Sequence, residues 1–472
     1  MKMNKKLFFI LLSIIIFVSN CSLAPKYVKP AAPIPQEWPQ GEAYDNNTLY
    51  NSASSNVPNI KWQDFFTDNR LQKIIELSLS YNRDLQIAAL NVERSRALYG
   101  ISRAELFPVI SADGSWSKTR VPASLTNTGK SMTEEQYNVN LGITSWELDF
   151  FGRIRSLKEQ ALQEYMATEQ AKRSTQISLI SEIARMYLAL GADLENLRLA
   201  QDTLQTQQDV YNIIKARYEV GLATEIDLSQ VQTQLDTARE NVATYTQLAA
   251  LDKNALDLLM GSQCPEELLP NEMGDTNLFK NISAGITSSI LLNRPDILQA
   301  EYQLKAAFAN IGAARAAFFP MITLTTFFGT ASDELSGLFN AGSDTWSFSP
   351  KINLPVFDMR TWASLRVSKT DREIARTNYE KAIQTAFREV ADTLAVAGTI
   401  DRQVNAQESI VYSTNTIYNL STERYMQGID NYLSVLDAQR NLYAAQQSLI
   451  SLRLTKLANQ VKLYEVLGGG SD

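Results

Sequence analysis

Hydrophobic and polar residues alternate with two different periods along this chain. Apolar residues recur at alternating steps of three and four in long stretches without proline, as in Val231, Leu235, Ala238, Val242, Tyr245 and Ala249. That spacing is the seam of a coiled coil. An unbroken helix over residues 156–220 would be about 100 Å long, more than a compact domain needs. The pattern therefore favours long paired helices over an ordinary amphipathic helix in a globular core.

A period of two residues marks four shorter segments. They are predicted strands at about 107–118, 136–149, 320–330 and 345–356. In the second of them Val139 and Leu141 alternate with Asn138 and Asn140, so one face is apolar and the other polar. The lengths suit tilted strands that cross a bilayer, and tryptophans near the strand ends suit its interfaces. A soluble β-sandwich is the alternative.

The chain is a duplicated unit. Gly100 and the residues around it recur 212 positions later around Gly312, and beyond residue 182 the spacing becomes 207, as in Gly221 and Gly428. The predicted divisions are a first repeat at 62–261, a connector at 262–287 and a second repeat at 288–470. Each repeat supplies one β-hairpin and long helices.

Four strands per chain predict self-association. Four strands cannot close a barrel, and the smallest membrane barrels have about eight. Three copies would supply twelve strands around a polar lumen. The long helices would continue from this barrel as a tube.

The N-terminus predicts export. Three lysines precede an apolar run at 7–18 that is too short for a permanent membrane helix, so residues 1–20 are predicted to be a secretory signal peptide. Cys21 stands where a bacterial lipoprotein carries its acyl chains, and an incidental cysteine is the alternative. Residues 21–61 would then be an extended, lipid-anchored segment. Ser22 after the cysteine gives no reason to expect retention in the inner membrane, so the anchor is expected in the outer membrane.

Composition argues against catalysis and against nucleic acid. The chain has no histidine, which removes the commonest general base and the commonest transition-metal ligand. Removal of residues 1–20 takes away three lysines and no acids, so the formal charge moves from −7 to −10. No enzyme activity, cofactor or metal site is therefore expected. Beyond the signal peptide no apolar stretch reaches the ~20 residues of a membrane helix, so a membrane crossing would have to use strands.

Several motifs together resemble the TolC-like outer-membrane efflux channels, in particular the lipoprotein branch typified by OprM. The resemblance extends from Trp62 to Gly470. It rests on Trp146-Glu147-Leu148-Asp149, Arg294-Pro295-Asp296-Ile297, Asn310-Ile311-Gly312-Ala313-Ala314-Arg315, Phe387-Arg388-Glu389-Val390, Leu436-Asp437-Ala438-Gln439-Arg440 and Leu467-Gly468-Gly469-Gly470.

This resemblance implies a fold and a function. The fold is an all-α periplasmic coiled-coil barrel plus a membrane β-barrel, assembled as a homotrimer with twelve strands and a long helical tunnel. The function is a passive, gated exit duct in the outer membrane of a Gram-negative bacterium. Its partners would be a periplasmic adaptor (membrane fusion) protein and a proton-driven inner-membrane pump of the RND type. Channels for type I protein secretion or metal export are the alternatives, followed by a non-channel coiled-coil structural lipoprotein.

A gate is predicted just after the turn at Gly428, which joins two long helices of the second repeat. Leu433 and Asp437 are four residues apart on one helix face, and in a trimer they would form an apolar ring and an acidic ring. A core leucine and a solvated surface acid are the alternative. The resemblance implies a carboxylate-to-phenol latch between Asp227 and Tyr425, and a further latch at Arg440. The TolC branch carries an arginine at the position of Asp430 and uses it in another latch. Because this chain has Asp430 there, that latch is not expected in the same form.

Two glycines mark equivalent turns between long helices. Gly221 and Gly428 each follow an Arg-Tyr pair and precede a resumed helix. The resemblance places these tips where an adaptor docks, and a structural need for positive φ accounts for the glycines as well. The predicted docking residues are Val220, Gly221, Leu222, Gln427, Gly428 and Ile429.

Overall fold

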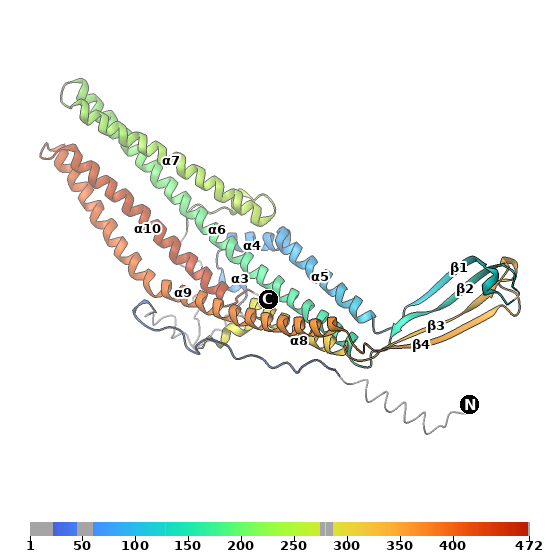
Figure 1. The fold of residues 1–472 in the computed structure, drawn as a ribbon. Helices are drawn as coiled ribbons and strands as arrows, with labels where there is room; N and C mark the ends of the chain where they lie inside the picture. Colours follow the sequence, from blue (N-terminus) through green and yellow to red (C-terminus); the bar gives the residue numbers. More distant parts are fainter. Residues whose placement is uncertain (1–21, 45–59, 128, 274–278, 280–286, 471–472) are drawn as a thin grey trace. The chain divides into compact units, whose positions relative to one another are not determined.

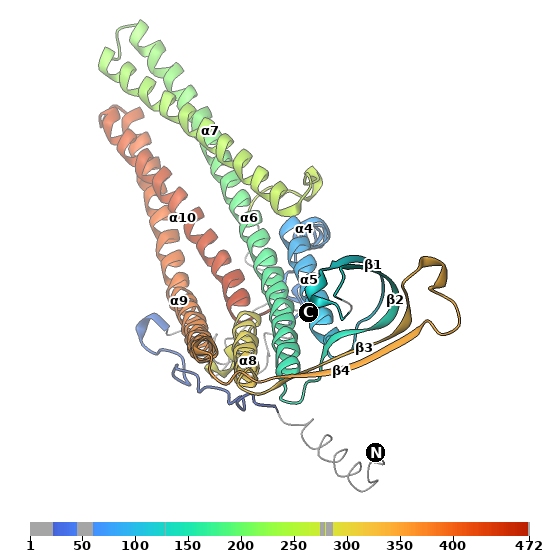
Figure 2. The same ribbon diagram turned by 45° about the vertical axis from the view of Figure 1, so that its right-hand side comes forward.

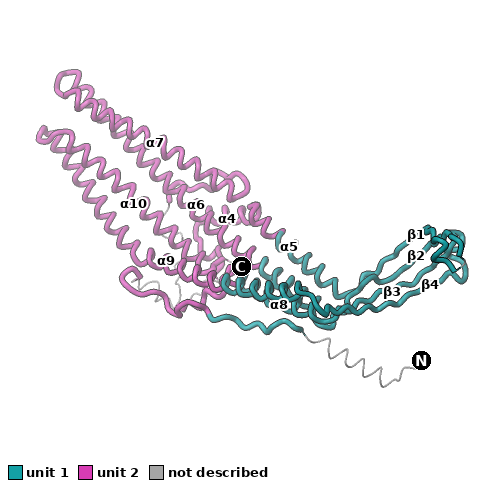
Figure 3. The backbone as a smooth tube through the Cα atoms, viewed as in Figure 1, with its two compact units in different colours: residues 1–31, 91–168, 299–379 teal, residues 32–90, 169–298, 380–472 magenta. Residues whose placement is uncertain are grey.

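The computed structural model describes residues 22–44, 60–127, 129–273, 279 and 287–470. The predicted signal peptide and the predicted lipidation site Cys21 lie outside the described residues. The chain divides into two compact units, which are described separately (Figure 3). Unit 1 comprises residues 1–31, 91–168 and 299–379, and unit 2 comprises residues 32–90, 169–298 and 380–472.

Unit 1 contains an antiparallel four-stranded sheet in the order β1-β2-β3-β4 (Figure 1). The strands are β1 (Ile110–Val121), β2 (Met132–Glu147), β3 (Met321–Ser332) and β4 (Asp344–Asn353). The first strand begins three residues later than expected, after Pro108, which has no N–H to donate to a ladder. The second begins four residues earlier, because the pairing extends through polar residues to Val121 opposite Met132.

The sheet has one apolar and one polar face. Leu141, Phe328 and Trp346 are directly opposite one another on neighbouring strands, and their side chains are 58%, 66% and 72% exposed. The adjacent rung on the opposite face pairs Asn140 with Gly329. Because successive residues of a strand point to opposite faces, this arrangement gives the sheet a wet side and a bare apolar side.

Eight α-helices are present in the described residues. They are α3 (Trp62–Phe65), α4 (Asn69–Tyr81), α5 (Arg83–Ala104), α6 (Arg153–Glu219), α7 (Glu225–Met260), α8 (Pro295–Ala316), α9 (Met359–Met426) and α10 (Tyr432–Val466). Short 3-10 turns accompany them. Helix α6 has 67 residues and α9 has 68, in agreement with the long seams in the sequence. No helix of the described chain is both long enough and apolar enough to span a bilayer.

Within unit 1 the N-terminal segment lies along α8. Lys29 Nζ is 2.8 Å from a carboxylate oxygen of the buried Glu301, and the Arg315 guanidinium donates to the Leu23 carbonyl at 3.0 Å. A Cβ built on Gly312 would lie 2.8 Å from the Ala24 Cβ, so only glycine fits there without movement. These contacts hold residues 23–29, just after Cys21, against the second repeat.

Two helical hairpins, α6 with α7 and α9 with α10, make up most of unit 2 (Figures 1 and 2). The first residues of α6, 153–168, and of α9, 359–379, belong to unit 1. The turns of the two hairpins contain Gly221 and Gly428 at φ 76° and 73°, a conformation that favours glycine. Helix α7 begins with a capping box between Thr224 and Asp227, and α10 begins with Asn431 accepting from the Ser434 N–H. The two hairpins are therefore the same element in the two repeats.

An aromatic cluster joins the beginning of the first repeat to the end of the second. The Phe65 and Tyr464 rings stack at 4.1 Å between centroids, Phe66 and Phe279 pack beside them, and the Tyr464 hydroxyl donates to the Ile60 carbonyl at 2.7 Å. This cluster explains why aromatic residues stand at both ends of the duplicated sequence.

Arg294 forms hydrogen bonds with three separate segments of the second repeat. Its guanidinium donates to Asp296 at 2.7 Å, to Glu389 at 2.9 Å and to the Val466 carbonyl at 2.7 Å. Charge-assisted bonds from one planar group can satisfy several acceptors at once. The Arg-Pro-Asp, Arg-Glu-Val and C-terminal glycine motifs therefore meet at one point.

Candidate gating site

The predicted gate residues surround a small hydrophobic cluster near the hairpin turns. Its buried members come from α6, α7 and α10, and they are Ile214, Val231, Tyr432, Val435 and Leu436. Burial of residues from three helices in one cluster holds the two hairpins of unit 2 together at this level.

Leu433 and Asp437 point away from this cluster. Leu433 is 47% exposed and Asp437 is exposed, whereas Leu436 between them is 2% exposed. The isolated chain therefore does not bury Leu433 in its core. The two side chains share the outward face of α10, as four-residue spacing requires.

Arg440 lies beside Asp437 on the same helix. Its guanidinium is 3.8 Å from the Asp437 carboxylate, and both side chains are more than half exposed. An exposed pair at this distance contributes little to stability. The acid that neighbours Arg440 in one chain is thus the predicted gate acid itself.

Tyr425 is held by Arg217 from the other hairpin. The guanidinium donates to the Tyr425 hydroxyl oxygen at 3.4 Å and lies 5.5 Å from the ring centroid, a cation–π distance. The ring also packs edge-on against Tyr432 at 5.2 Å. Burial raises the pKa of Tyr425, the Arg217 charge lowers it and the Asp227 charge raises it.

Asp227 caps α7. Its carboxylate accepts from the Thr224 N–H at 2.9 Å and from the Thr224 hydroxyl at 2.7 Å. In the described part of the chain these are the hydrogen bonds of the Asp227 side chain. Asp227 therefore acts on Tyr425 through its charge, while Arg217 occupies the hydrogen-bonding position at the phenol.

Asp430 forms an ion pair within the second turn. Its carboxylate accepts from Arg424 Nε at 2.5 Å and from Nη2 at 3.1 Å, and these bonds lower the pKa of Asp430. The sequence predicts a role for Tyr425 but none for the arginines of the two Arg-Tyr pairs, Arg217 and Arg424. The signal was present, since an arginine precedes each turn and an acid follows this one.

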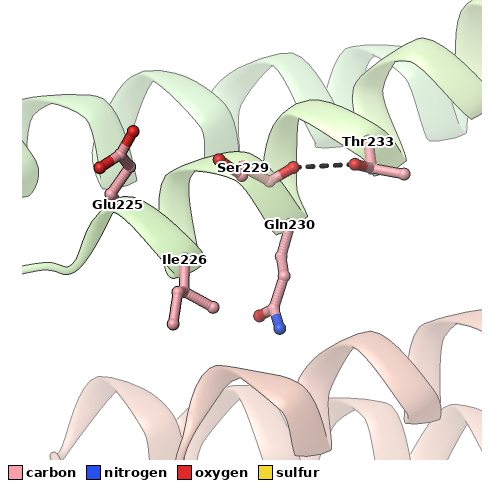
Figure 4. A pocket seen from close by; sticks show the side chains of 5 residues that line it. All are labelled: Glu225, Ile226, Ser229, Gln230 and Thr233. Atoms are coloured by element: carbon pink, nitrogen blue, oxygen red, sulfur yellow. Dashed lines mark hydrogen bonds between the residues drawn. The ribbon is translucent and has the colours of Figure 1, made fainter.

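The predicted docking residues lie at the turns and are open to solvent. Val220 is 69% exposed, Leu222 is 70% exposed and Ile429 is 57% exposed. Just beyond the first turn, α7 carries a shallow hollow lined by Glu225, Ile226, Ser229, Gln230 and Thr233. Figure 4 shows the side chains of Ile226 and Gln230 pointing in one direction and Glu225 pointing away.

No catalytic constellation accompanies these residues in the described chain. Groups of three or more histidine, cysteine or acidic side chains that could hold a metal ion are also absent from the described residues. A sheet with one bare apolar face, joined in sequence to helical hairpins far longer than a compact domain needs, defines a channel-type outer-membrane protein.

Comparisons with known proteins give the family. The outer membrane efflux protein model matches residues 74–262 and 286–469, so the chain belongs to that family. The toluene efflux pump outer membrane protein TtgC of Pseudomonas putida is 46% identical over 454 residues, covering 96% of this chain and 93% of TtgC. The cation efflux system protein CusC of Escherichia coli is 38% identical over 458 residues, covering 96% of each chain.

Solved structures agree. The open-state outer membrane channel MtrE of Neisseria gonorrhoeae has a TM-score of 0.84 at 35% identity, covering 96% of this chain and 99% of MtrE. A membrane protein of Pseudomonas aeruginosa has a TM-score of 0.88 at 37% identity, covering 95% and 98%. The expected fold class, the efflux function and the outer-membrane location of a Gram-negative bacterium are confirmed.

Two leucines of α10 test the geometry of the cluster. Leu436→Ala should destabilise the packing of the hairpin tips by about 2–5 kcal/mol, because it empties a buried site. Leu433→Ala, the same change on the exposed face, should cost less than about 0.5 kcal/mol. Hydrogen exchange of the α10 amides measures both, and equal effects would contradict the assignment of the buried and exposed faces.

Proposed function

We propose that the chain is the outer-membrane exit duct of a tripartite efflux system that exports drugs and other small organic solutes. Three copies form the duct, which docks to a periplasmic adaptor protein and an inner-membrane RND-type pump. The pump supplies the energy, and the duct supplies a gated, water-filled path. The names of relatives that act in toluene, solvent and antibiotic efflux support this solute class.

The main observation in support of the trimer is that equivalent helices of the two repeats, α8 and α5, are packed differently. Helix α8 is covered on two sides within unit 1. A Cβ on Gly312 would lie 2.5 Å from the Ser156 hydroxyl of α6, and the ring of Phe318, just past the end of α8, packs against Trp362 of α9 with centroids 4.9 Å apart. The small residues Ala309, Ala313 and Ala316 of α8 are buried.

Helix α5 is the same helix in the first repeat, yet one face is bare. Ile101 is 62% exposed, Ala97 and Ala104 are exposed, and a Cβ on Gly100 would meet nothing within 4 Å. These positions precede their buried α8 counterparts by 212 residues. The duplicated sequence therefore supplies a packing face that one chain leaves empty.

The complementary bare face lies on α9. Ser156 and Ala167 of α6 are buried, whereas the residues 207 positions later, Ala363 and Ile374 of α9, are exposed. A second copy can bring its α9 face to the α5 face and repeat the α6–α8 contact between chains. Rotational assembly of identical chains then covers every copy of both faces.

The sheet supports the same assembly. Strands β1 and β4 each have one edge without a partner strand in the described residues. Exposed edges invite pairing with another chain, and closure into a barrel removes them. Three sheets of four strands give twelve strands, with the polar face lining the lumen and the apolar face against lipid.

A disulfide tests this contact in the membrane-inserted protein. Gly100→Cys with Ala363→Cys should give covalent dimers and trimers on mild oxidation, because the two positions repeat the close contact of Gly312 with Ser156. Gly100→Cys with Lys369→Cys is the matched control and should stay monomeric under denaturing conditions. Absence of linked chains in the first variant, with normal membrane insertion, would contradict the proposed interface.

The gate follows from the trimer. Three Leu433 side chains would form an apolar constriction and three Asp437 carboxylates a cation-favouring ring. Asp227, Tyr425 and Arg440 would act as latches that bias the hairpins toward the closed state. The exposed residues Val220, Gly221, Leu222, Gln427, Gly428 and Ile429 would contact the adaptor.

Conductance and ion selectivity of purified channels in planar bilayers distinguish the proposed latch, Asp227 and Tyr425, from the proposed acidic ring of Asp437. Asp227→Ala with Tyr425→Phe should raise conductance, because the closed state loses the Asp227 charge and the Tyr425 hydroxyl that Arg217 binds. Thr224→Ala is the control, since it breaks the α7 cap but keeps the carboxylate charge. Asp437→Ala should mainly weaken cation preference. Conductance unchanged in the latch variant, or selectivity unchanged in Asp437→Ala, would remove the corresponding assignment.

Acylation of Cys21 would anchor each copy in the outer membrane. The contacts of residues 23–29 with α8 support this proposal, because they hold the chain just after Cys21 in a fixed place. Intact-mass measurement of the mature chain should show added acyl mass that Cys21→Ala abolishes. An unmodified native mass would reject the anchor and leave the channel proposal intact, since the strands carry their own apolar face.

A further inference from the structure

Two acids occupy facing positions in the seam of the α6–α7 hairpin. Ile214 of α6 and Val231 of α7 are buried in the same cluster near the turn. The helices are antiparallel, so a move of three heptads away from the turn along both leads from these residues to Asp193 and Asp252. Asp252 continues the predicted apolar spacing of α7, where a coiled coil normally places an apolar residue.

The two carboxyl groups contact each other. Each is a hydrogen-bonding partner of the other, which requires one proton between them, and Asn196 also bonds Asp193. The Oδ2 atom of Asp252 is buried and accepts no hydrogen bond from an N–H or hydroxyl group in the described residues. Burial is the main cause that raises the pKa of both acids, and it brings the pKa of Asp252 to about 6.

The fold does not require acids at this level. The corresponding positions of the α9–α10 hairpin, 207 residues later, hold Ile400 and Asn459. Ile400 is buried, and the Asn459 amide donates to the Thr393 carbonyl at 3.1 Å. The same hairpin geometry is thus made in the second repeat by an apolar residue and a neutral amide.

We propose that Asp193 and Asp252 share one proton and form a pH-sensitive fastener between α6 and α7. With the proton present, an O–H···O bond joins the helices across the seam. When the proton leaves, two carboxylates face each other in a partly buried site and repel. The fastener is a property of the hairpin, so it does not depend on the proposed exit-duct function.

A polar connection leads from this fastener to the second repeat. Burial raises the pKa of Tyr245 of α7, and the nearby Asp193 charge contributes to this rise. Gln447 of α10 donates to the Tyr245 hydroxyl oxygen at 2.6 Å. Burial together with Tyr245 raises the pKa of Tyr443, also on α10, to about 12. Loosening at the acid pair therefore occurs beside a contact between the two hairpins.

Nearby charged groups have other partners. Lys253 pairs with Glu266 at 3.4 Å, and Arg453 pairs with Glu408 at 3.0 Å. Glu195 of α6 accepts from a backbone N–H at 3.3 Å, and burial raises its pKa. The causes that act on the two fastener carboxyls are burial, each other and Asn196, so the pair itself sets its titration.

The sign of the pH effect follows from the raised pKa values. An acid whose pKa is higher in the folded hairpin than in the opened one stabilises the hairpin at low pH, and this stabilisation is lost as pH rises through the folded value. With an Asp252 pKa of about 6 against an ordinary value of 3.8, the local opening constant should rise up to about ten-fold between about pH 5 and about pH 7.5.

Hydrogen exchange of the full-length, detergent-extracted protein tests the fastener. Protection of the α7 amides around residues 245–258, corrected for the intrinsic pH dependence of exchange, should fall several-fold from mildly acidic to neutral pH. In Asp252→Asn the protection should stay high and flat, because the amide can donate to Asp193 at every pH. Asp236→Asn is the matched control, since Asp236 is an exposed acid of α7 paired with Arg239.

A double variant and a spectrum complete the test. Asp193→Ile with Asp252→Asn imports the pair of the second repeat and should abolish the pH dependence. If that variant fails to fold, the native protein still decides, because a shared proton gives an infrared carboxylic-acid band that disappears near pH 6. Flat native protection, full pH dependence in Asp252→Asn, or absence of that band would each overturn the proposal.

Discussion

The structure depends on one packing constraint, the need of each repeat's opening helix for cover on two sides. Within a chain, α8 approaches α6 closely at Gly312, and α9 packs against Phe318 just past the end of α8. In the described part of the chain the equivalent face of its counterpart α5 is exposed, and so is the matching face of α9. Buried apolar contact is the main favourable term in association, so a duplicated chain with one satisfied and one unsatisfied copy of the same contact is built to meet further copies.

The same duplication explains how the gating site differs between repeats. The two hairpins have the same length and the same glycine turns, so their tips can be held side by side by one small cluster. The two tips differ in the contacts of their polar side chains. Asp227 caps α7 in the first hairpin, whereas Arg424 pairs with Asp430 in the second. Arg217 of the first hairpin donates to Tyr425 of the second. Small electrostatic differences on equal scaffolds are suited to biasing a two-state tip.

Much of the fold could be predicted from the sequence because its periods are long. The three-and-four seam extends over helices of 67 and 68 residues, and the two-residue period marks both faces of each strand. Strand ends were less certain, since polar residues continue the ladder from Val121 to Met132. Contacts such as Lys29 with Glu301, 272 residues apart, leave no periodic signal, and the carboxyl pair of Asp193 and Asp252 appears only when the hairpin register is known.

In the proposed trimer, identical copies close the bare faces and bare strand edges of one chain. Native mass measurement of the detergent-extracted mature protein tests it most directly. We expect a single species of three chains, because three sets of four strands close a twelve-stranded barrel. A stable, monodisperse monomer would contradict it.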